Sequence, residues 1–158
     1  MGEPLILNLC PTGMIPTRDM TPYVPLSPDE IIRDVLECAE VGVTSVHLHA
    51  RESDGSPSSR PEVFAEIIAG IREVRTDVVL GVTTSGRSDP TLESRSKVLT
   101  LKGDLRPDMA SLTTSSLNFA RSASVNSPNV VRGLAERMRD AGIKPELEIF
   151  DIGMARYV

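Results

Sequence analysis

The sequence predicts an α/β fold built on a parallel β-sheet. Five short apolar segments with the character of buried strands alternate with four segments of helical periodicity, and each strand ends in polar residues. Strands that alternate with helices form βαβ units, whose strands run parallel. In open sheets and in closed barrels alike, chemistry gathers at the carboxyl ends of such strands.

The first strand and the first helix have clear local signals. Residues 4–9 form an apolar run that ends in a Cys-Pro-Thr-Gly loop, which is typical of a buried strand. A proline-rich stretch follows, and the next helix is expected from Pro28 to about Gly42. Ser27 is its predicted N-cap, Pro28 takes the first helical position, and Glu30 completes a capping box.

The middle of the chain repeats this order. A second strand is predicted at residues 44–49, followed by a loop over 51–56 and a helix over 61–74 that opens on a proline. A third strand is predicted at 77–84, and it stops at a Ser-Gly-Arg turn. A third helix is expected within 90–102.

The C-terminal third completes the alternation. We expect a strand at 109–113, a polar loop at 114–118, a helix from Ser127-Pro128 to about Gly142, and a fifth strand at 147–152. A further helix is expected after that strand. Neither a Gly-x-Gly-x-x-Gly motif nor a Walker A loop occurs, so nucleotide-binding folds of those classes are not indicated.

The composition indicates an ordinary water-soluble domain over residues 1–158. The chain has 40% hydrophobic and 25% charged residues, and its net charge of -5 argues against nucleic acid as a partner. No apolar run approaches the roughly 20 residues that span a bilayer, and the N-terminus carries no basic region typical of a signal peptide. Two cysteines without metal or redox spacing favour a cytoplasmic location.

His47 and His49 are the only histidines in the chain, and they stand two positions apart at the end of a predicted strand. Side chains alternate along a strand, so both imidazoles lie on one face and can bind one divalent metal ion. Zinc is the expected metal, because imidazole suits it. The alternative is a pair of packed or hydrogen-bonded histidines at a sheet edge. The polar residues at the other strand ends favour the metal.

Glu146 and Glu148 follow the same spacing on the fifth strand. Two carboxylates on one inner face are costly unless they meet a cation, a metal or hydrogen-bond donors. We interpret them as a substrate-binding or metal-supporting pair, and the alternative is an ion pair with an arginine or lysine. Asp151 at the end of the same predicted strand favours function.

Loop residues extend the candidate site. Ser85 and Gly86 offer a hydroxyl and an approachable N–H group suited to a carboxylate, or they form a simple turn. Thr113 and Asn118 can supply further hydrogen bonds. Arg51 either fixes a carboxylate or is a solvated loop arginine paired with a nearby aspartate.

Several motifs occur here in one order: Pro11-Thr12-Gly13, Ser-Pro-Asp-Glu-Ile, Val-His-Leu-His-Ala-Arg, Thr-Thr-Ser-Gly-Arg and Lys-Pro-Glu-Leu-Glu-Ile-Phe-Asp. In this order they resemble the β-keto acid cleavage enzymes, whose type member is the 3-keto-5-aminohexanoate cleavage enzyme of lysine fermentation. The resemblance covers residues 4–158. It implies a (β/α)₈ barrel of the TIM type, represented in this chain by about five βα units.

The resemblance also implies a site and an activity. Such enzymes bind one zinc ion, form homo-oligomers, and condense a β-keto acid with acetyl-CoA to give acetoacetate and a new acyl-CoA. His47 and His49 match the two histidine ligands of the zinc, and Ser85 and Gly86 match residues that hold the carboxylate of the keto acid. The pocket-lining positions of the family fall at Thr113, Asn118, and Glu146 or Glu148.

Two departures from the family pattern shape the expectations. Members of the family are nearly twice as long, and their third zinc ligand, a glutamate, and their catalytic arginine and aspartate fall beyond residue 158. Shortly after Pro-Thr-Gly the type enzyme has an acidic residue that meets the amino group of its substrate. This chain has Met14 and Ile15 there, so we expect a substrate that lacks a cationic amino group.

Three hypotheses follow. The first is a zinc-dependent β-keto acid cleavage enzyme. The second is a metal-dependent amidohydrolase, which also uses a His-x-His pair at a barrel strand. The third is an inactive truncated or split-barrel fragment that needs a partner chain. For an isolated five-stranded piece we expect weak zinc binding and self-association through its open edges.

Overall fold

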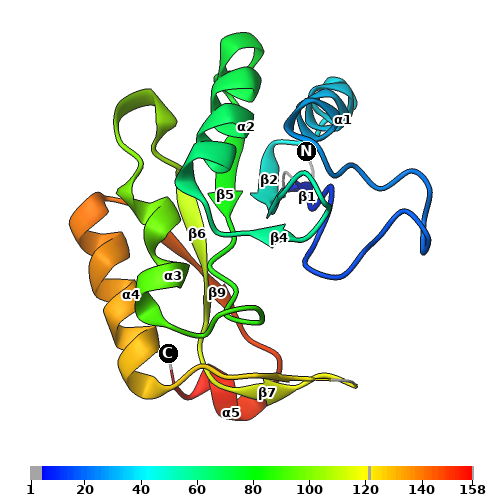
Figure 1. Cartoon of the computed structure of the whole chain (residues 1–158). Helices are drawn as coiled ribbons and strands as arrows, with labels where there is room; N and C mark the ends of the chain where they lie inside the picture. Colours follow the sequence, from blue (N-terminus) through cyan, green and yellow to red (C-terminus); the bar gives the residue numbers. More distant parts are fainter. Residues whose placement is uncertain (1–4, 121, 158) are drawn as a thin grey trace.

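The structure is a computed structural model that describes residues 5–120 and 122–157. Its central sheet has five parallel strands in the order of the chain (Figure 1). They are β1 (Asn8–Leu9), β2 (Ser45–Leu48), β5 (Val79–Val82), β6 (Met109–Thr113) and β9 (Lys144–Glu148). Because parallel crossovers are right-handed, consecutive strand order places the connecting helices on one face, as in a barrel rather than a doubly wound sheet. The predicted α/β class is confirmed.

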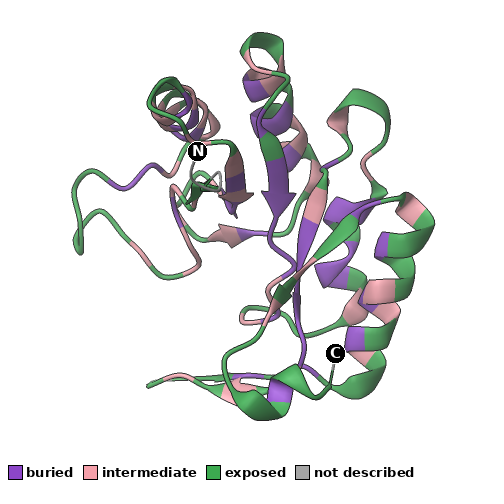
Figure 2. Cartoon of the chain, turned by 180° about the vertical axis from the view of Figure 1, so that it is seen from behind, coloured by how far each residue is buried: buried purple, intermediate pink, exposed green. Residues whose placement is uncertain are grey.

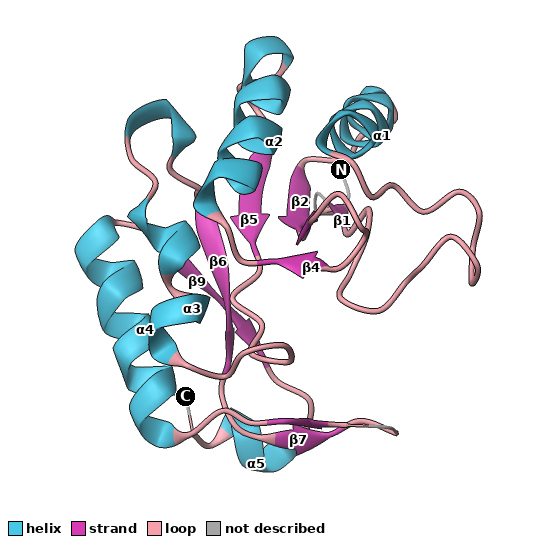
Figure 3. Ribbon diagram, viewed as in Figure 1, coloured by secondary structure: helices cyan, strands magenta, loops and turns pink. Residues whose placement is uncertain are grey.

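Three long helices cover the outer face of the sheet (Figure 3). They are α1 (Pro28–Glu40), α2 (Pro61–Val74) and α4 (Pro128–Ala141). Their apolar stripes bury residues such as Val35, Ile67 and Leu134 in one cluster with Leu48 and Leu80 of the sheet. Figure 2 shows these buried positions along the strands and on the helix sides that face them. The other face of the sheet is left for polar side chains.

Two short hairpins begin in or beside the predicted loops 51–56 and 114–118, and their second strands lie beyond those loops. β3 (Ala50–Arg51) pairs with β4 (Pro57–Ser58), and β7 (Leu117–Asn118) pairs with β8 (Ala123–Ser124). Both are antiparallel and separate from the central sheet. They extend from the carboxyl ends of β2 and β6, so each adds residues at the end of the sheet where a site is expected.

The helix expected within residues 90–102 is broken into shorter pieces. The structure has α3 (Leu92–Arg95), then the 3₁₀ turns η1 (Lys97–Thr100) and η2 (Gly103–Leu105). At the break, Ser96 donates its hydroxyl to the carbonyl oxygens of Leu92 and Glu93. A serine that bonds back to the preceding turn in this way competes with regular helical bonding.

The fifth strand begins three residues and ends four residues earlier than predicted. β9 runs over Lys144–Glu148, includes Pro145, and is followed by a loop and α5 (Ile152–Ala155). Pro145 is tolerated because β9 is an edge strand, where a missing N–H does not interrupt a ladder. Asp151 is not at a strand end. Its carboxylate caps α5 by accepting the N–H of Met154 at 2.9 Å.

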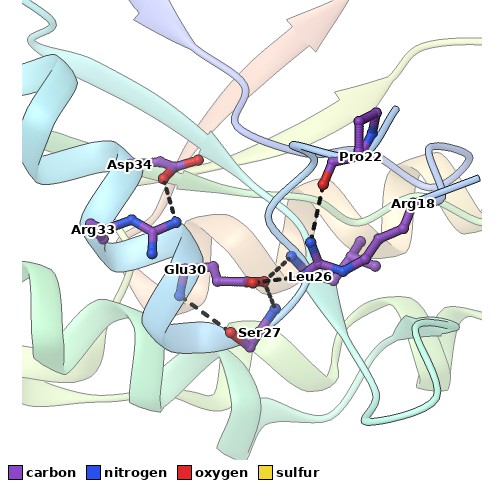
Figure 4. A network of polar contacts seen from close by, with 7 residues as sticks. All are labelled: Arg18, Pro22, Leu26, Ser27, Glu30, Arg33 and Asp34. Carbon is purple, nitrogen blue, oxygen red and sulfur yellow. Dashed lines mark hydrogen bonds and ion pairs between the residues drawn. The ribbon is translucent and has the colours of Figure 1, made fainter. Parts of the chain in front are cut away.

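The first helix begins with the predicted capping box (Figure 4). Ser27 Oγ accepts the N–H of Glu30 at 3.3 Å, and Glu30 Oε2 accepts the N–H of Ser27 at 3.1 Å and of Leu26 at 3.0 Å. Arg18 also donates to Glu30. Together these bonds lower the pKa of Glu30 to about 2, with the two backbone donors as the main cause. Glu30 therefore ties the proline-rich segment to α1.

Replacing Glu30 with glutamine is expected to destabilise the chain near neutral pH by up to about 1 kcal/mol, the typical value of a helix cap. The folded structure lowers the pKa of this carboxyl from 4.5 to about 2. Its stabilisation is therefore present above pH 4.5 and lost as the pH falls through 2. Urea unfolding at both extremes checks this, with the exposed Glu37→Gln in the same helix as control. An equal loss near pH 2 would contradict it.

No helix within residues 5–120 and 122–157 is long and apolar enough to cross a membrane.

Candidate functional site

A polar cavity of about 230 Å³ lies at the carboxyl ends of the central strands. The two histidines and residues from the ends of three other strands line it, among them Thr83, Thr113 and Glu148. Alternation along β2 buries Val46 and Leu48 in the helix-covered core and leaves His47 and His49 for the inner face. The structure thus brings together most of the residues that the sequence singled out.

His47 is held by Glu146, which reaches it from another strand. The Nδ1–H of His47 donates to Glu146 Oε2 at 2.7 Å, and Asn8 Nδ2 donates to the other carboxylate oxygen at 3.1 Å. The hydrogen bond from His47 lowers the pKa of Glu146. Because Nδ1 carries the proton, Nε2 of His47 keeps its lone pair. Glu146 therefore fixes the tautomer and the orientation of the ring.

The same contacts show that the sheet is strongly curved. Asn8 lies on β1 and Glu146 on β9, the two outer strands of the five. In a flat sheet these strands would be separated by roughly 19 Å, yet their side chains meet at 3.1 Å. Gly81 on β5 leaves space for the Glu146 side chain to reach His47. A Cβ at Gly81 would lie 3.7 Å from Glu146 Oε2 and only 3.1 Å from the carbonyl oxygen of Val46.

His49 is buried and has an unused ring nitrogen. His49 is only 9% exposed, and its Nδ1 has no hydrogen-bond partner in the described part of the chain. Burial, with contributions from His47, Arg51 and Arg87, lowers the pKa of His49 to about 3. The ring is therefore neutral at physiological pH. The centroids of the two imidazoles are 5.0 Å apart, with an angle of 50° between the rings.

The turn after β5 and the end of β6 complete the wall. Ser85 lines the cavity, and its N–H donates to Thr83 Oγ1 at 3.1 Å. Gly86 is buried beside it. Across the cavity, the hydroxyl of Thr113 donates to the carboxylate of Glu148. These groups offer donors and one acceptor to a polar ligand.

Two predicted site residues lie elsewhere. Asn118 is exposed on β7, because alternation along that hairpin places its neighbours Leu117 and Phe119 at the cavity instead. Glu146 lies behind His47 rather than among the lining residues. Within residues 5–120 and 122–157, neither glutamate pairs with an arginine or lysine: Glu146 accepts from His47 and Asn8, and Glu148 accepts from Thr113.

Arg51 has a role that neither sequence interpretation anticipated. It is 4% exposed and donates to the carbonyl oxygens of Gly13, Pro16 and Gly55, the last at 2.8 Å. Within the described residues it makes no ion pair with Asp54. Instead it fixes the loop after β1, which carries Met14 into the cavity.

Sequence reasoning also missed an aromatic and cationic side of the cavity. The guanidinium of Arg87 lies 3.4 Å from the ring centroid of Phe119, and Phe119 packs edge-on against Phe150. All three residues line the cavity. The Ser-Gly-Arg motif contained the arginine, but only the folded chain brings Phe119 of the β7–β8 hairpin and Phe150 of the β9–α5 loop to it.

A complete metal site is not present in the described residues. Within 5–120 and 122–157, no three His, Cys, Asp or Glu side chains are arranged to hold a metal ion. The two histidines supply a pair of imidazole nitrogens on one wall.

Comparison with known families identifies the chain. The profile of the β-keto acid cleavage enzyme family matches residues 4–158. The chain belongs to this family. The match covers every strand that contributes to the cavity, and it removes the amidohydrolase alternative that the His-x-His pair left open.

Characterised relatives agree with this assignment. The chain is 40% identical over 154 residues to a 3-oxoadipate:acetyl-CoA acetyltransferase of Cupriavidus necator, with 98% of this chain and 52% of the relative covered. It is 34% identical over 158 residues to a 3-keto-5-aminohexanoate cleavage enzyme of Fusobacterium nucleatum, with 99% and 57% covered. The chain thus spans about half the length of the relatives it matches.

Solved structures support the barrel-type fold. A ternary complex of ObcA with a C4-CoA adduct and oxalate matches with a TM-score of 0.79 at 20% identity, covering 86% of this chain and 33% of ObcA. The apo structure of ObcA gives a TM-score of 0.76 over the same share of this chain. At this identity the likeness concerns the fold, and it agrees with a partial barrel of about five βα units.

Proposed function

We propose that this chain provides the zinc-binding wall of an enzyme that cleaves β-keto acids with acetyl-CoA, yielding acetoacetate and a new acyl-CoA. The observation that carries the proposal is the His47–Glu146 hydrogen bond beside the unpartnered His49 at a polar cavity. Both characterised relatives are named for reactions of β-keto acids, and one name includes acetyl-CoA.

The histidine pair suits a zinc ion in three respects. Ligating histidines in proteins commonly donate their second ring N–H to a carboxylate, as His47 does to Glu146. His49 is neutral, which is the form that binds metals. Two imidazoles that share one tetrahedral zinc have ring centroids about 5 Å apart, and the observed separation is 5.0 Å.

Different residues of this chain would bind the keto oxygen and the carboxylate of the keto acid. A zinc ion on His47 and His49 would polarise a keto oxygen and stabilise negative charge on it. Ser85 and Gly86 would hold the carboxylate, and Thr113 orients Glu148 at the opposite wall. The buried position of His49 and the apolar Met14, Leu117 and Phe150 limit water beside the reacting carbon.

The lining of the cavity favours a substrate without a cationic amino group. Met14 occupies the wall next to the histidines, and Arg87 adds a cation there. A protonated amino group beside Arg87 would meet a like charge. A neutral or anionic substituent suits this wall, and the 3-oxoadipate in the name of the Cupriavidus relative is of the anionic kind.

The site also requires partners for two sheet edges. β1 and β9 each pair with one strand only in the described sheet, and large apolar side chains such as Ile6, Ile149 and Ile152 are exposed beside them. Open edges with apolar neighbours attract further strands. We propose that the working enzyme completes the barrel there, through further chain segments or a partner chain, and assembles as a homo-oligomer in the cytoplasm.

A substrate panel tests the proposed function. With zinc and acetyl-CoA, acetoacetate formation from 3-oxoadipate is expected to exceed that from 3-keto-5-aminohexanoate by at least about tenfold, the cost of one unfavourable charge contact. The assay follows acyl-CoA by chromatography, and sedimentation of the same samples records the assembly state. Preference for the amino-bearing acid would contradict the proposed substrate class. Zinc-independent turnover would contradict the metal site.

A further inference from the structure

Arg95 is a buried cation that no ion pair explains. It is 3% exposed, and its Nε–H donates to the carbonyl oxygen of Thr84 at 2.7 Å. Its Nη1 is fully buried without a hydrogen-bond partner in the part of the chain that the structure describes. No carboxylate among those residues lies within ion-pair distance of it. Burial lowers the pKa of Arg95 and nearby Glu148 raises it, but the guanidinium remains charged.

The guanidinium lies directly behind the Ser85–Gly86 turn. A Cβ built on Gly86 would stand 3.0 Å from Arg95 Nη1, 3.1 Å from its Cδ and 3.2 Å from its Cζ. Gly86 does not have a positive φ, so backbone conformation does not require glycine at this position. The close approach of Arg95 favours glycine here, because a Cβ would force the guanidinium to shift by a few tenths of an ångström.

A second cavity adjoins the candidate site and is bordered by Arg95. This cavity, of about 60 Å³, has Arg95 in its wall together with the hydroxyl-bearing Ser88 and Ser94. Met14, Thr83 and Ser85 line both this cavity and the larger one that contains the histidines. Arg95 and the histidines thus lie on opposite sides of the same turn.

The backbone of the turn is fixed from two sides. Thr84 donates its N–H to Ser111 Oγ at 3.0 Å and its hydroxyl to the carbonyl oxygen of Ser111 at 2.6 Å. From the other side, Arg95 donates to the carbonyl oxygen of Thr84. That carbonyl belongs to the same peptide unit as the N–H of Ser85, which donates to Thr83 Oγ1 at 3.1 Å. A charged donor on the oxygen therefore strengthens this bond and holds the peptide unit before Gly86 in place.

We propose that Arg95 is a positioning residue that places positive charge behind the Ser85–Gly86 turn and thereby makes it selective for a carboxylate. A buried, unpaired cation is costly, and an anion on the far side of the turn offsets that cost. The inference rests on the proposed function, in which this turn holds the carboxylate of a β-keto acid. Arg95 acts through the peptide units of the turn and through its field, not by direct contact.

Acetoacetate and its uncharged methyl ester are the probes. By ligand-observed NMR titration, Arg95→Met is expected to weaken acetoacetate binding on the order of tenfold, as expected for one partly screened charge interaction. Methyl acetoacetate is expected to bind both proteins equally. Arg95→Lys keeps the charge and should retain most of the affinity. The control is Arg137→Met, since Arg137 holds α3 from outside through Ser96 and Glu93.

If Arg95→Met lost affinity equally for acetoacetate and its methyl ester, or for neither, the inference would be overturned and the proposed function would stand. Failure of the unmodified chain to bind acetoacetate would overturn it as well, whereas zinc binding tests the proposed function separately. Should Arg95→Met not fold, the Arg95 Nε–H resonance of the unmodified chain decides. It is expected to shift with acetoacetate and not with the ester, and an unchanged resonance would refute the role of Arg95.

Discussion

Replacing Arg51 with methionine is expected to lower the free energy of unfolding by about 3 kcal/mol, because three carbonyl oxygens lose a charged donor at once. These oxygens belong to Gly13, Pro16 and Gly55, and Arg51 is almost fully buried among them. Methionine fills much of the space but donates no hydrogen bond. The loop that carries Met14 is then expected to detach from the β3–β4 hairpin.

Thermal and urea unfolding measure this effect. For a chain of this size the loss corresponds to a fall in melting temperature of roughly 6–12 °C. Arg60→Met is the matched control, since Arg60 lies near the same hairpin, is exposed, and pairs only with Glu52 and Glu62 at the surface. Equal stability of the two variants would mean that Arg51 does not anchor the loop.

Replacing Glu146 with glutamine is expected to weaken zinc binding by about 10–100-fold, the usual cost of losing a carboxylate partner of a metal-ligating histidine. Glutamine can still accept the Nδ1–H of His47 through its amide oxygen. It lacks the negative charge that makes the ring more basic, and its NH₂ group does not suit the donor of Asn8. The expected loss of zinc affinity is therefore larger than the similar shapes of glutamate and glutamine suggest.

Competition with a chromophoric chelator measures the affinity, which is expected to be weak in the unmodified chain because only two ligands are in place. Glu62→Gln serves as control, because the Glu62 side chain is 72% exposed on the opposite side of the helix layer from the sheet interior. An unchanged zinc affinity in Glu146→Gln would remove the carboxylate from the metal site. Zinc binding that survives His47→Ala would remove the histidine as well.

Local signals in the sequence were sufficient for most of the fold. The three long helices begin at the predicted prolines, Pro28, Pro61 and Pro128, and serine side chains cap the first and the third, because these signals act within one turn. The strand at 109–113 coincides with β6. The last strand is misplaced in the sequence prediction because it includes Pro145, which local patterns exclude from strands, and only the sheet order shows that β9 is an edge of the described sheet.

The candidate site was predictable in part. Alternation along single strands placed His47 and His49 on one face, and the same rule placed Glu146 and Glu148 together. The bond between His47 and Glu146 depends on the curvature of the sheet and on Gly81, which no single segment encodes. Arg51 and Arg95 were also beyond local patterns, because a buried arginine and a surface arginine look alike in a sequence.

The Asn8–Glu146–His47 contact has a consequence for the folding of the chain. Asn8 and Glu146 are 138 positions apart, and His47 and Glu146 are 99 apart. Contacts of such sequence separation form late, because the entropy of closing long loops must be spent before they contribute. The histidine ring is therefore oriented only after the first and last strands have docked. Binding of a metal at this pair would then require the docked five-stranded sheet. We expect metal uptake by a refolding chain to follow the rate of folding rather than that of diffusion.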